Sequence, residues 1–189
     1  MGTVHWIDEL GRLTPAAWSG AEHAWSEESF SAVFHQNYSR IVGVAARVLG
    51  DRAQAEEVAD DAFWKLYRRP QLQREGNNIS AWLYRTASRM AIDVLRGRKR
   101  LRLAQEGLAG EPVAFPQGPL AEMLAGERVL KVRQTLAALK PQQAQILALR
   151  HSGLSYAEVA AALGIRPSSV GTTLARAEAA FEAHYRRSE

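Results

Sequence analysis

The hydrophobic and polar positions of this chain follow a helical period wherever a period is readable. Apolar residues recur at helical spacing over 30–48, and Gly50 is well placed to end this first predicted helix. Asp51 followed by Gln54 resembles a capping box, which predicts a second helix ending near Tyr67. The apolar stripe of this second helix comprises Ala55, Val58, Ala59, Ala62, Phe63 and Leu66.

A third helix is predicted after a connection over 70–78. Its expected apolar face comprises Ile79, Trp82, Leu83, Thr86, Met90 and Val94. Arg85, Arg89 and Arg96 are expected together on the opposite face, at spacings of four and seven. Cations beside aromatic rings hold single-stranded nucleic acid, which makes Trp82 and Tyr84 candidate base platforms. The alternative for Trp82, a place in the hydrophobic core, stays open.

The helical pattern breaks over 104–121, where glycine and proline gather at Gly107, Gly110, Pro112, Pro116, Gly118 and Pro119. This is the composition of a flexible linker. No alternating strand pattern competes with the helices. We therefore expect an all-α protein with an N-terminal extension over 1–26 and two small helical domains over 27–103 and 122–189, joined by the linker.

The C-terminal half predicts a helix-turn-helix. A helical pattern over 129–139 stops at Pro141 and restarts, and Ser155 with Glu158 then forms a capping box. The next helix is expected from Pro167 to Phe181. Ala160, Gly164 and Val170 have the spacing of a helix-turn-helix, in which a small residue, a turn glycine and a locking apolar residue are needed. An ordinary helical hairpin is the alternative.

Composition removes several classes of protein. The 189 residues are 47% hydrophobic and 23% charged, which excludes disorder throughout. With no cysteine, disulfides, thiolate zinc sites and thiol nucleophiles are excluded. No apolar run reaches the length of a membrane span, and charged residues near the start argue against a secretory signal, so we expect a cytoplasmic protein. The five histidines are scattered, and no phosphate loop is present, which predicts no enzyme and no metal or cofactor.

Charge is unevenly distributed along the chain. The net charge is only +4, but residues 76–103 carry seven basic groups against Asp93 alone, a local charge of +6. A basic stripe of this kind attracts polyanions. The second helix instead carries four acids within six residues: Glu56, Glu57, Asp60 and Asp61. These acids form either a solvated face or a docking patch for a basic partner.

In these features the chain resembles a bacterial RNA polymerase sigma factor of the extracytoplasmic-function (ECF) group. The segment 55–63 resembles the part of region 2 that docks on the polymerase, although the family usually has Gln in place of Asp60. The segment 82–96 resembles the part that melts and reads the −10 promoter element, and 139–177 resembles the helix-turn-helix of region 4 that reads the −35 element.

The resemblance implies a factor that is not itself an enzyme and that directs promoter-specific initiation by core RNA polymerase. Its expected partners are core polymerase, promoter DNA and an anti-sigma factor. The residues implied in polymerase binding are Glu56, Glu57, Asp60 and Asp61. Those implied at the −10 element are Asn77, Asn78, Trp82, Arg85, Arg89 and Arg96. Those implied at the −35 element are Arg166, Ser168, Ser169, Thr172, Thr173 and Arg176. The competing hypothesis is a stand-alone helix-turn-helix regulator that binds duplex DNA without polymerase.

Overall fold

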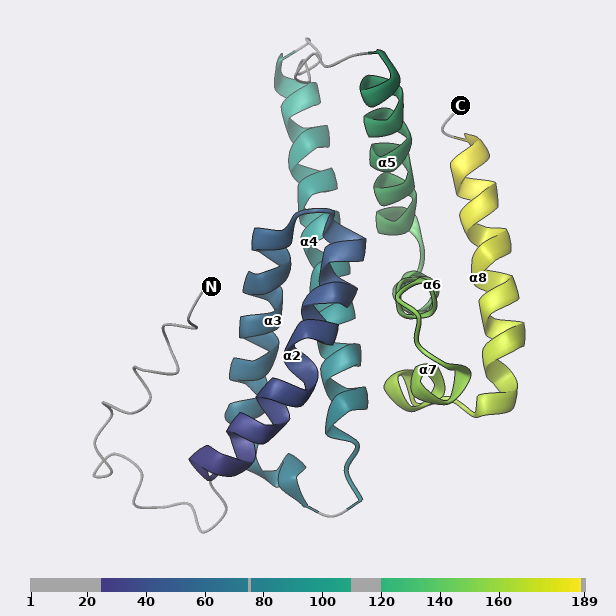
Figure 1. The fold of residues 1–189 in the computed structure, drawn as a ribbon. Helices are drawn as coiled ribbons and strands as arrows, with labels where there is room; N and C mark the ends of the chain where they lie inside the picture. The colour runs from purple at the N-terminus through teal and green to yellow at the C-terminus, as the bar shows by residue number, and fades with distance from the viewer. Residues whose placement is uncertain (1–24, 75, 110–119, 188–189) are drawn as a thin grey trace.

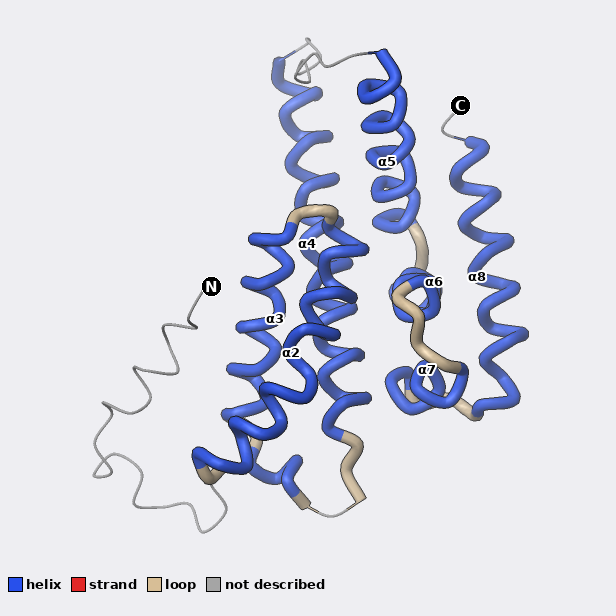
Figure 2. Tube along the Cα trace, viewed as in Figure 1, coloured by secondary structure: helices blue, strands red, loops and turns tan. Residues whose placement is uncertain are grey.

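The computed structural model describes residues 25–74, 76–109 and 120–187, and all regular structure in these ranges is helical, as predicted (Figures 1 and 2). The helices of the N-terminal half are α2 (Glu27–Leu49), α3 (Arg52–Tyr67), the short 3₁₀ helix η2 (Pro70–Gln73) and α4 (Ile79–Ala109). Those of the C-terminal half are α5 (Leu120–Ala138), α6 (Pro141–His151), α7 (Tyr156–Leu163) and α8 (Pro167–Arg187). Most of the predicted N-terminal extension and the middle of the predicted linker lie outside the described residues.

The predicted helix ends are confirmed by their caps. The Gly50 backbone is left-handed, with φ 67°, and its N–H donates to the Ala46 carbonyl at 2.7 Å. The Asp51 carboxylate accepts from the Gln54 N–H at 3.1 Å, although the Gln54 side chain bonds to that same carboxylate and not to backbone. Half of the predicted capping box is therefore present at the start of α3, enough to satisfy one otherwise unpaired N–H.

The core of the N-terminal half is aromatic. Phe63 of α3 is fully buried and lies 4.8 Å, centroid to centroid, from Phe34 of α2. Burying a side chain of this size contributes about 1.5–3 kcal/mol. Trp25, assigned from the sequence to the N-terminal extension, belongs to this core: it is 8% exposed, and its indole N–H donates to the Leu66 carbonyl at 3.2 Å. The readable apolar period begins only at Phe30, so it could not place Trp25 in the core.

The predicted linker is helical at both ends. Residues 104–109 continue α4, and α5 begins at Leu120 rather than at residue 129. Alanine, leucine, glutamine and glutamate favour a helix in these stretches even though an apolar period is missing. At the other end of the chain, α8 continues past the predicted stop at Phe181 to Arg187.

The two halves pack against each other, which the sequence did not predict. Helix α4 contacts α2 and α3 on one side and α5, α6 and α7 on the other, so it forms the centre of the molecule (Figure 1). Buried residues of both halves join in one continuous hydrophobic cluster.

The described part of the chain contains neither a membrane-spanning helix nor a metal-binding group. None of its helices is both long and apolar enough to cross a membrane. Its acidic and histidine side chains also form no group that could hold a metal ion.

Candidate nucleic-acid interface

The basic face of α4 is divided between solvent and the C-terminal half. Arg85 and Arg89 are exposed, and the Arg89 side chain is 75% accessible with its Nε 4.0 Å from Asp93. Arg96 is different, because its side chain is 22% exposed and turned onto the end of α5. The expectation that all three arginines share one open face is therefore wrong for Arg96.

Arg96 caps α5 from the neighbouring half. Its Nη2 donates to the Leu139 carbonyl at 2.8 Å, and its Nε donates to the Ala137 carbonyl at 3.4 Å. Carbonyls at a helix C-terminus lack intrahelical partners and carry partial negative charge, so a cation there is stabilising. The arginine thus holds the C-terminal half onto α4.

Gln145 makes a second polar contact between the halves. It is 9% exposed, and its amide donates to the Arg85 carbonyl at 3.2 Å and reaches the Ser88 hydroxyl at 3.5 Å. Ser88 itself is fully buried. Neither residue was identified from the sequence, because a glutamine and a serine inside helical stretches give no signal of a partner 57 or 60 residues away.

A third contact joins α2 to the first helix of the predicted helix-turn-helix. Arg40 Nη2 lies 2.8 Å from Glu158 Oε1, and these side chains are 57% and 37% exposed. The Ser155 N–H also donates to Glu158, and this bond, together with Arg40, lowers the pKa of Glu158 to about 2. The predicted Ser155–Glu158 capping box is confirmed, with an added role in holding α2.

The two aromatic candidates of α4, Trp82 and Tyr84, differ in their exposure to solvent. Trp82 is partly exposed, and the Arg69 guanidinium lies 5.5 Å from its ring centroid. Tyr84 is 2% exposed and lies beneath Arg40, 5.3 Å from its ring, so the hypothesis that it is a base platform is wrong. Tyr84 lies on the buried face because that face runs through Leu83, Ala87 and Ala91, rotated from the stripe predicted through Trp82 and Met90.

The two candidate asparagines shape the loop before α4. The Asn78 side chain accepts from the Ala81 N–H at 2.9 Å, which makes it a cap of α4. Asn77 donates to the Gln71 carbonyl at 3.2 Å and so closes the turn after η2. Both residues remain exposed beside the first turn of α4.

The predicted helix-turn-helix is present as α7 and α8. Ala160 is 2% exposed, Val170 is fully buried, and Gly164 has the required left-handed backbone with φ 66°. The six −35 candidates lie on the turn and the first three turns of α8. The exposed ones are Arg166, Ser168, Thr172 and Arg176, and the partly buried ones are Ser169 and Thr173. Thr173 donates to the Ser169 carbonyl at 2.7 Å, so its hydroxyl is already bonded within the helix.

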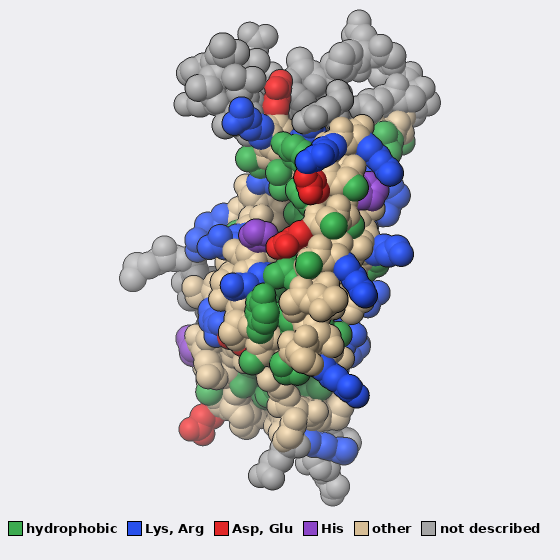
Figure 3. All heavy atoms as spheres, turned by 90° about the vertical axis from the view of Figure 1, so that its right-hand side faces the viewer, with side chains coloured by type: hydrophobic (Ala, Val, Ile, Leu, Met, Phe, Trp, Pro, Cys, Tyr) green, Lys and Arg blue, Asp and Glu red, His purple; other side chains and the backbone are tan. Residues whose placement is uncertain are grey.

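The face that includes α8 is rich in cations. Figure 3 shows lysine and arginine side chains from top to bottom of this face, with few acidic ones between them. A surface of this kind matches the phosphate contacts that position a protein on DNA.

The four acids of α3 do not form a single open cluster. Glu56 lies 2.9 Å from Arg52, and Asp60 accepts from the Tyr38 hydroxyl at 3.0 Å. Burial and this bond raise the pKa of Tyr38 above its usual range. Glu57 and Asp61, four residues apart on the helix, are the exposed members. These two are therefore the most exposed acids of α3, and the Glu56 side chain beside them is 42% exposed.

Fold and surfaces together define a helical DNA-binding protein in two parts. Residues 33–101 match the family of sigma-70 region 2, and residues 130–181 match sigma-70 region 4. The chain belongs to the sigma-70 family of RNA polymerase sigma factors, in its ECF group. It is thus a transcription initiation factor that acts with polymerase, and the competing hypothesis of a stand-alone regulator is not supported.

Three relatives illustrate this similarity. The RNA polymerase sigma factor YlaC of Bacillus subtilis is 30% identical over 155 residues, covering 79% of this chain and 88% of the relative. The sigma-H factor of Pseudomonas aeruginosa is 28% identical, covering 82% of this chain and 86% of the relative. The ECF sigma factor SigE of Mycolicibacterium smegmatis is 26% identical, covering 78% of this chain and 58% of that longer relative.

Solved structures support the fold. CnrH, in complex with the cytosolic domain of CnrY, is similar with a TM-score of 0.53 and 21% identity, over 87% of this chain and 92% of that one. The sigma factor RpoE of Bartonella quintana, in complex with the anti-sigma factor NepR, has a TM-score of 0.50 and 20% identity, over 84% and 98%.

Proposed function

We propose that this sigma factor docks on core polymerase through α3, reads the −10 element with α4 and the loop before it, and reads the −35 element with α8. The observation that carries the proposal is the presence of three chemically distinct exposed surfaces on one chain. These are the acidic pair Glu57 and Asp61, the arginines of α4, and the polar start of α8.

The −10 role rests on α4. Arg85 and Arg89 supply exposed cations for a phosphate backbone, and Trp82 lies partly exposed three residues before Arg85. Separated strands expose bases that an aromatic surface can stack, and the stacking offsets part of the cost of unpairing. Asn77 and Asn78 lie at the loop end of the same surface and contribute amides for base edges.

The −35 role rests on the start of α8. The N-terminal end of a recognition helix carries base-edge contacts, and Ser168, Thr172 and Arg176 are exposed along its first turns. Arginine makes bidentate contacts to guanine, so Arg176 is the strongest candidate for sequence-specific contact, with Arg166 and Ser169 placed for phosphates.

The two halves must separate for both elements to be read. The positions −10 and −35 lie about 25 base pairs apart. This separation is roughly 85 Å along a duplex at 3.4 Å per base pair. Helices α4 and α7 are in contact here, so one rigid molecule of this shape cannot reach both. We infer that polymerase binding exchanges the contacts of Arg96, Gln145 and Glu158 for contacts with its own surface.

An anti-sigma factor is the expected regulatory partner, and the cytoplasm is the expected location. The related CnrH and RpoE structures were each solved with a second protein, named an anti-sigma factor in the case of RpoE. Such a partner would act by competing with polymerase for the same halves.

Co-purification with core polymerase, followed by promoter-dependent transcription in vitro, tests the proposal. Glu57→Lys with Asp61→Lys should abolish retention on core polymerase, whereas Glu127→Lys with Glu178→Lys should not. The second pair is also exposed and makes the same change in charge, but lies on α5 and α8. Equal loss of binding by both variants would show that only net charge matters, and undiminished binding by the first would remove α3 from the docking surface.

A further inference from the structure

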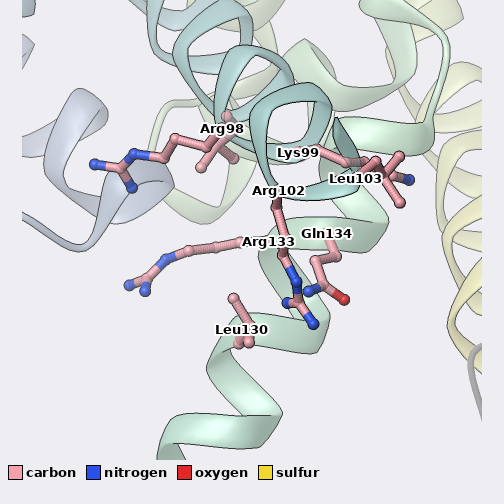
Figure 4. A pocket seen from close by; sticks show the side chains of 8 residues that line it. Arg98, Lys99, Arg102, Leu103, Leu130, Arg133 and Gln134 are labelled. Carbon is pink, nitrogen blue, oxygen red and sulfur yellow. The ribbon is translucent and has the colours of Figure 1, made fainter. Parts of the chain in front are cut away.

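A pocket between α4 and α5 is lined by cations from both halves of the chain. Its volume is about 270 Å³, and α4 contributes Arg98, Lys99 and Arg102 while α5 contributes Arg133 and Gln134 (Figure 4). Leucine side chains from both helices form the rest of its wall, Leu130 among them. No carboxylate lines the described part of this pocket.

The cations are brought together by packing, at an electrostatic cost. Arg98 and Arg133 come from different halves, and Figure 4 shows both side chains extending in the same direction. Burial and the nearby charge of Arg98 lower the pKa of Arg133.

Neutral groups hold Arg98 and Arg133 without cancelling their charge. Arg98 donates to the side-chain carbonyl of Gln54. The Arg133 guanidinium lies over Gly50 at the C-terminal end of α2, so closely that a Cβ at Gly50 would overlap it. A helix C-terminus offers only partial negative charge. The guanidinium groups of Arg98 and Arg133 are therefore held in place before any ligand binds, and they keep their positive charge.

We propose that this pocket is a binding site for an oligophosphate, a small molecule with two or more linked phosphates. Guanidinium groups bind phosphate oxygens in pairs, and a lysine adds a point charge. Arg98 and Arg133 extend one way and Arg102 another (Figure 4), so a single phosphate contacts only part of the set, whereas linked phosphates can reach more of it. The leucine wall lowers the local dielectric, which strengthens these contacts, and it gives space to an apolar group carried by the ligand.

Occupation of the pocket would strengthen the packing of the two halves. The ligand contacts α4 and α5 together, so it binds the packed arrangement better than the separated one. A ligand with that preference shifts the equilibrium toward packing in proportion to its concentration over Kd.

Calorimetric titration of the full chain with sodium tripolyphosphate, at constant ionic strength, tests the site. We expect saturable binding that weakens at least tenfold in Arg133→Gln and stays within twofold in Arg128→Gln. The control removes the same charge from an exposed position of the same helix. Circular dichroism must show unchanged helicity, and Lys99→Gln, at the same pocket, replaces Arg133→Gln if that variant fails to fold.

Three results would overturn the proposal. The first is the absence of saturable binding, and the second is equal weakening in the Arg133 and Arg128 variants, which would indicate a general charge effect. The third comes from a parallel titration with single-stranded DNA. If DNA binding depends on Arg133 more strongly than tripolyphosphate binding does, the pocket holds a nucleic-acid backbone instead.

Discussion

Replacing Arg96 with glutamine should loosen the packing of the two halves far more than breaking the ion pair between them. The Arg96 side chain is 22% exposed and makes one short and one long bond to the carbonyls that end α5. A hydrogen bond to a charged group contributes about 1.5–3 kcal/mol. Its position at a helix C-terminus adds about 0.3–1 kcal/mol. Because glutamine can retain part of one bond, we expect a loss of about 2 kcal/mol, or roughly a 30-fold change in the equilibrium.

The ion pair between Arg40 and Glu158 has a smaller expected effect despite its 2.8 Å distance. Its side chains are 57% and 37% exposed, and exposed pairs contribute about 0–1 kcal/mol. Arg40→Gln should therefore change the packing equilibrium by less than about fivefold. The difference between these variants is the measurement that tests whether burial governs the interface.

The absence of cysteine from the chain makes a direct assay possible. Ser88 is fully buried against Gln145, so in a Ser88→Cys background the thiol should react with iodoacetamide only when the halves separate. We expect the labelling rate to rise about 30-fold with Arg96→Gln and less than about fivefold with Arg40→Gln, with helicity unchanged. Arg100→Gln, an exposed change on the same helix, is the control. An unchanged rate in Arg96→Gln, or an equal rise in the control, would refute this account of the interface.

Three further predictions concern separate parts of the molecule. The pKa of Glu158 is lowered to about 2 in the folded chain, so its stabilising effect is complete above the ordinary value of 4.5 and is lost as pH falls toward 2. The difference in melting temperature between the unmodified chain and Glu158→Gln should therefore shrink from pH 5.5 to pH 3, and a constant difference would contradict it. Gly50→Ala should cost about 1–2 kcal/mol for its positive φ; urea titration should show a larger loss than for Gly153→Ala, since only Gly50 also meets Arg133. Arg89→Gln should slow open-complex formation on duplex promoters and be rescued by a premelted −10 bubble, whereas equal defects on both templates would assign Arg89 to general affinity.

Local signals in the sequence were sufficient for most of the helices. All six residues of the predicted apolar stripe of α3 are buried, and the turn glycine Gly164 and its capping box are as expected. These features depend on residues three to seven apart, so period and capping chemistry determine them.

Contacts between the halves could not be predicted in the same way. Arg40 pairs with a residue 118 positions away, and Gln145 bonds to α4 across 57 to 60 positions. The apolar face of α4 was also predicted too narrowly. This helix packs on several sides, and its buried face is wider than one stripe. The candidate DNA-contacting residues stay a prediction, but Tyr84 is buried and Arg96 is largely covered by the C-terminal half, which the sequence did not indicate.

Asp60 shows how a departure from a family pattern can have a local physical cause. The family resemblance leads one to expect glutamine there, whereas this chain has aspartate. Its carboxylate accepts the Tyr38 hydroxyl at 3.0 Å, across the contact between α2 and α3. This bond ties Asp60 to the packing of α2 on α3, whereas Glu57 and Asp61 are the most exposed acids of the helix.

The arginines of α4 differ in what they contact. Arg89 is open to solvent and can meet DNA without any change in the packing of the two halves. Arg96 can meet DNA only after it leaves the carbonyls of α5, and that step costs the contacts that hold the halves together. We therefore expect any binding of promoter DNA at Arg96 to be coupled to release of the C-terminal half through this side chain. A promoter that engages Arg96 would favour the separated arrangement that reading the −35 element requires.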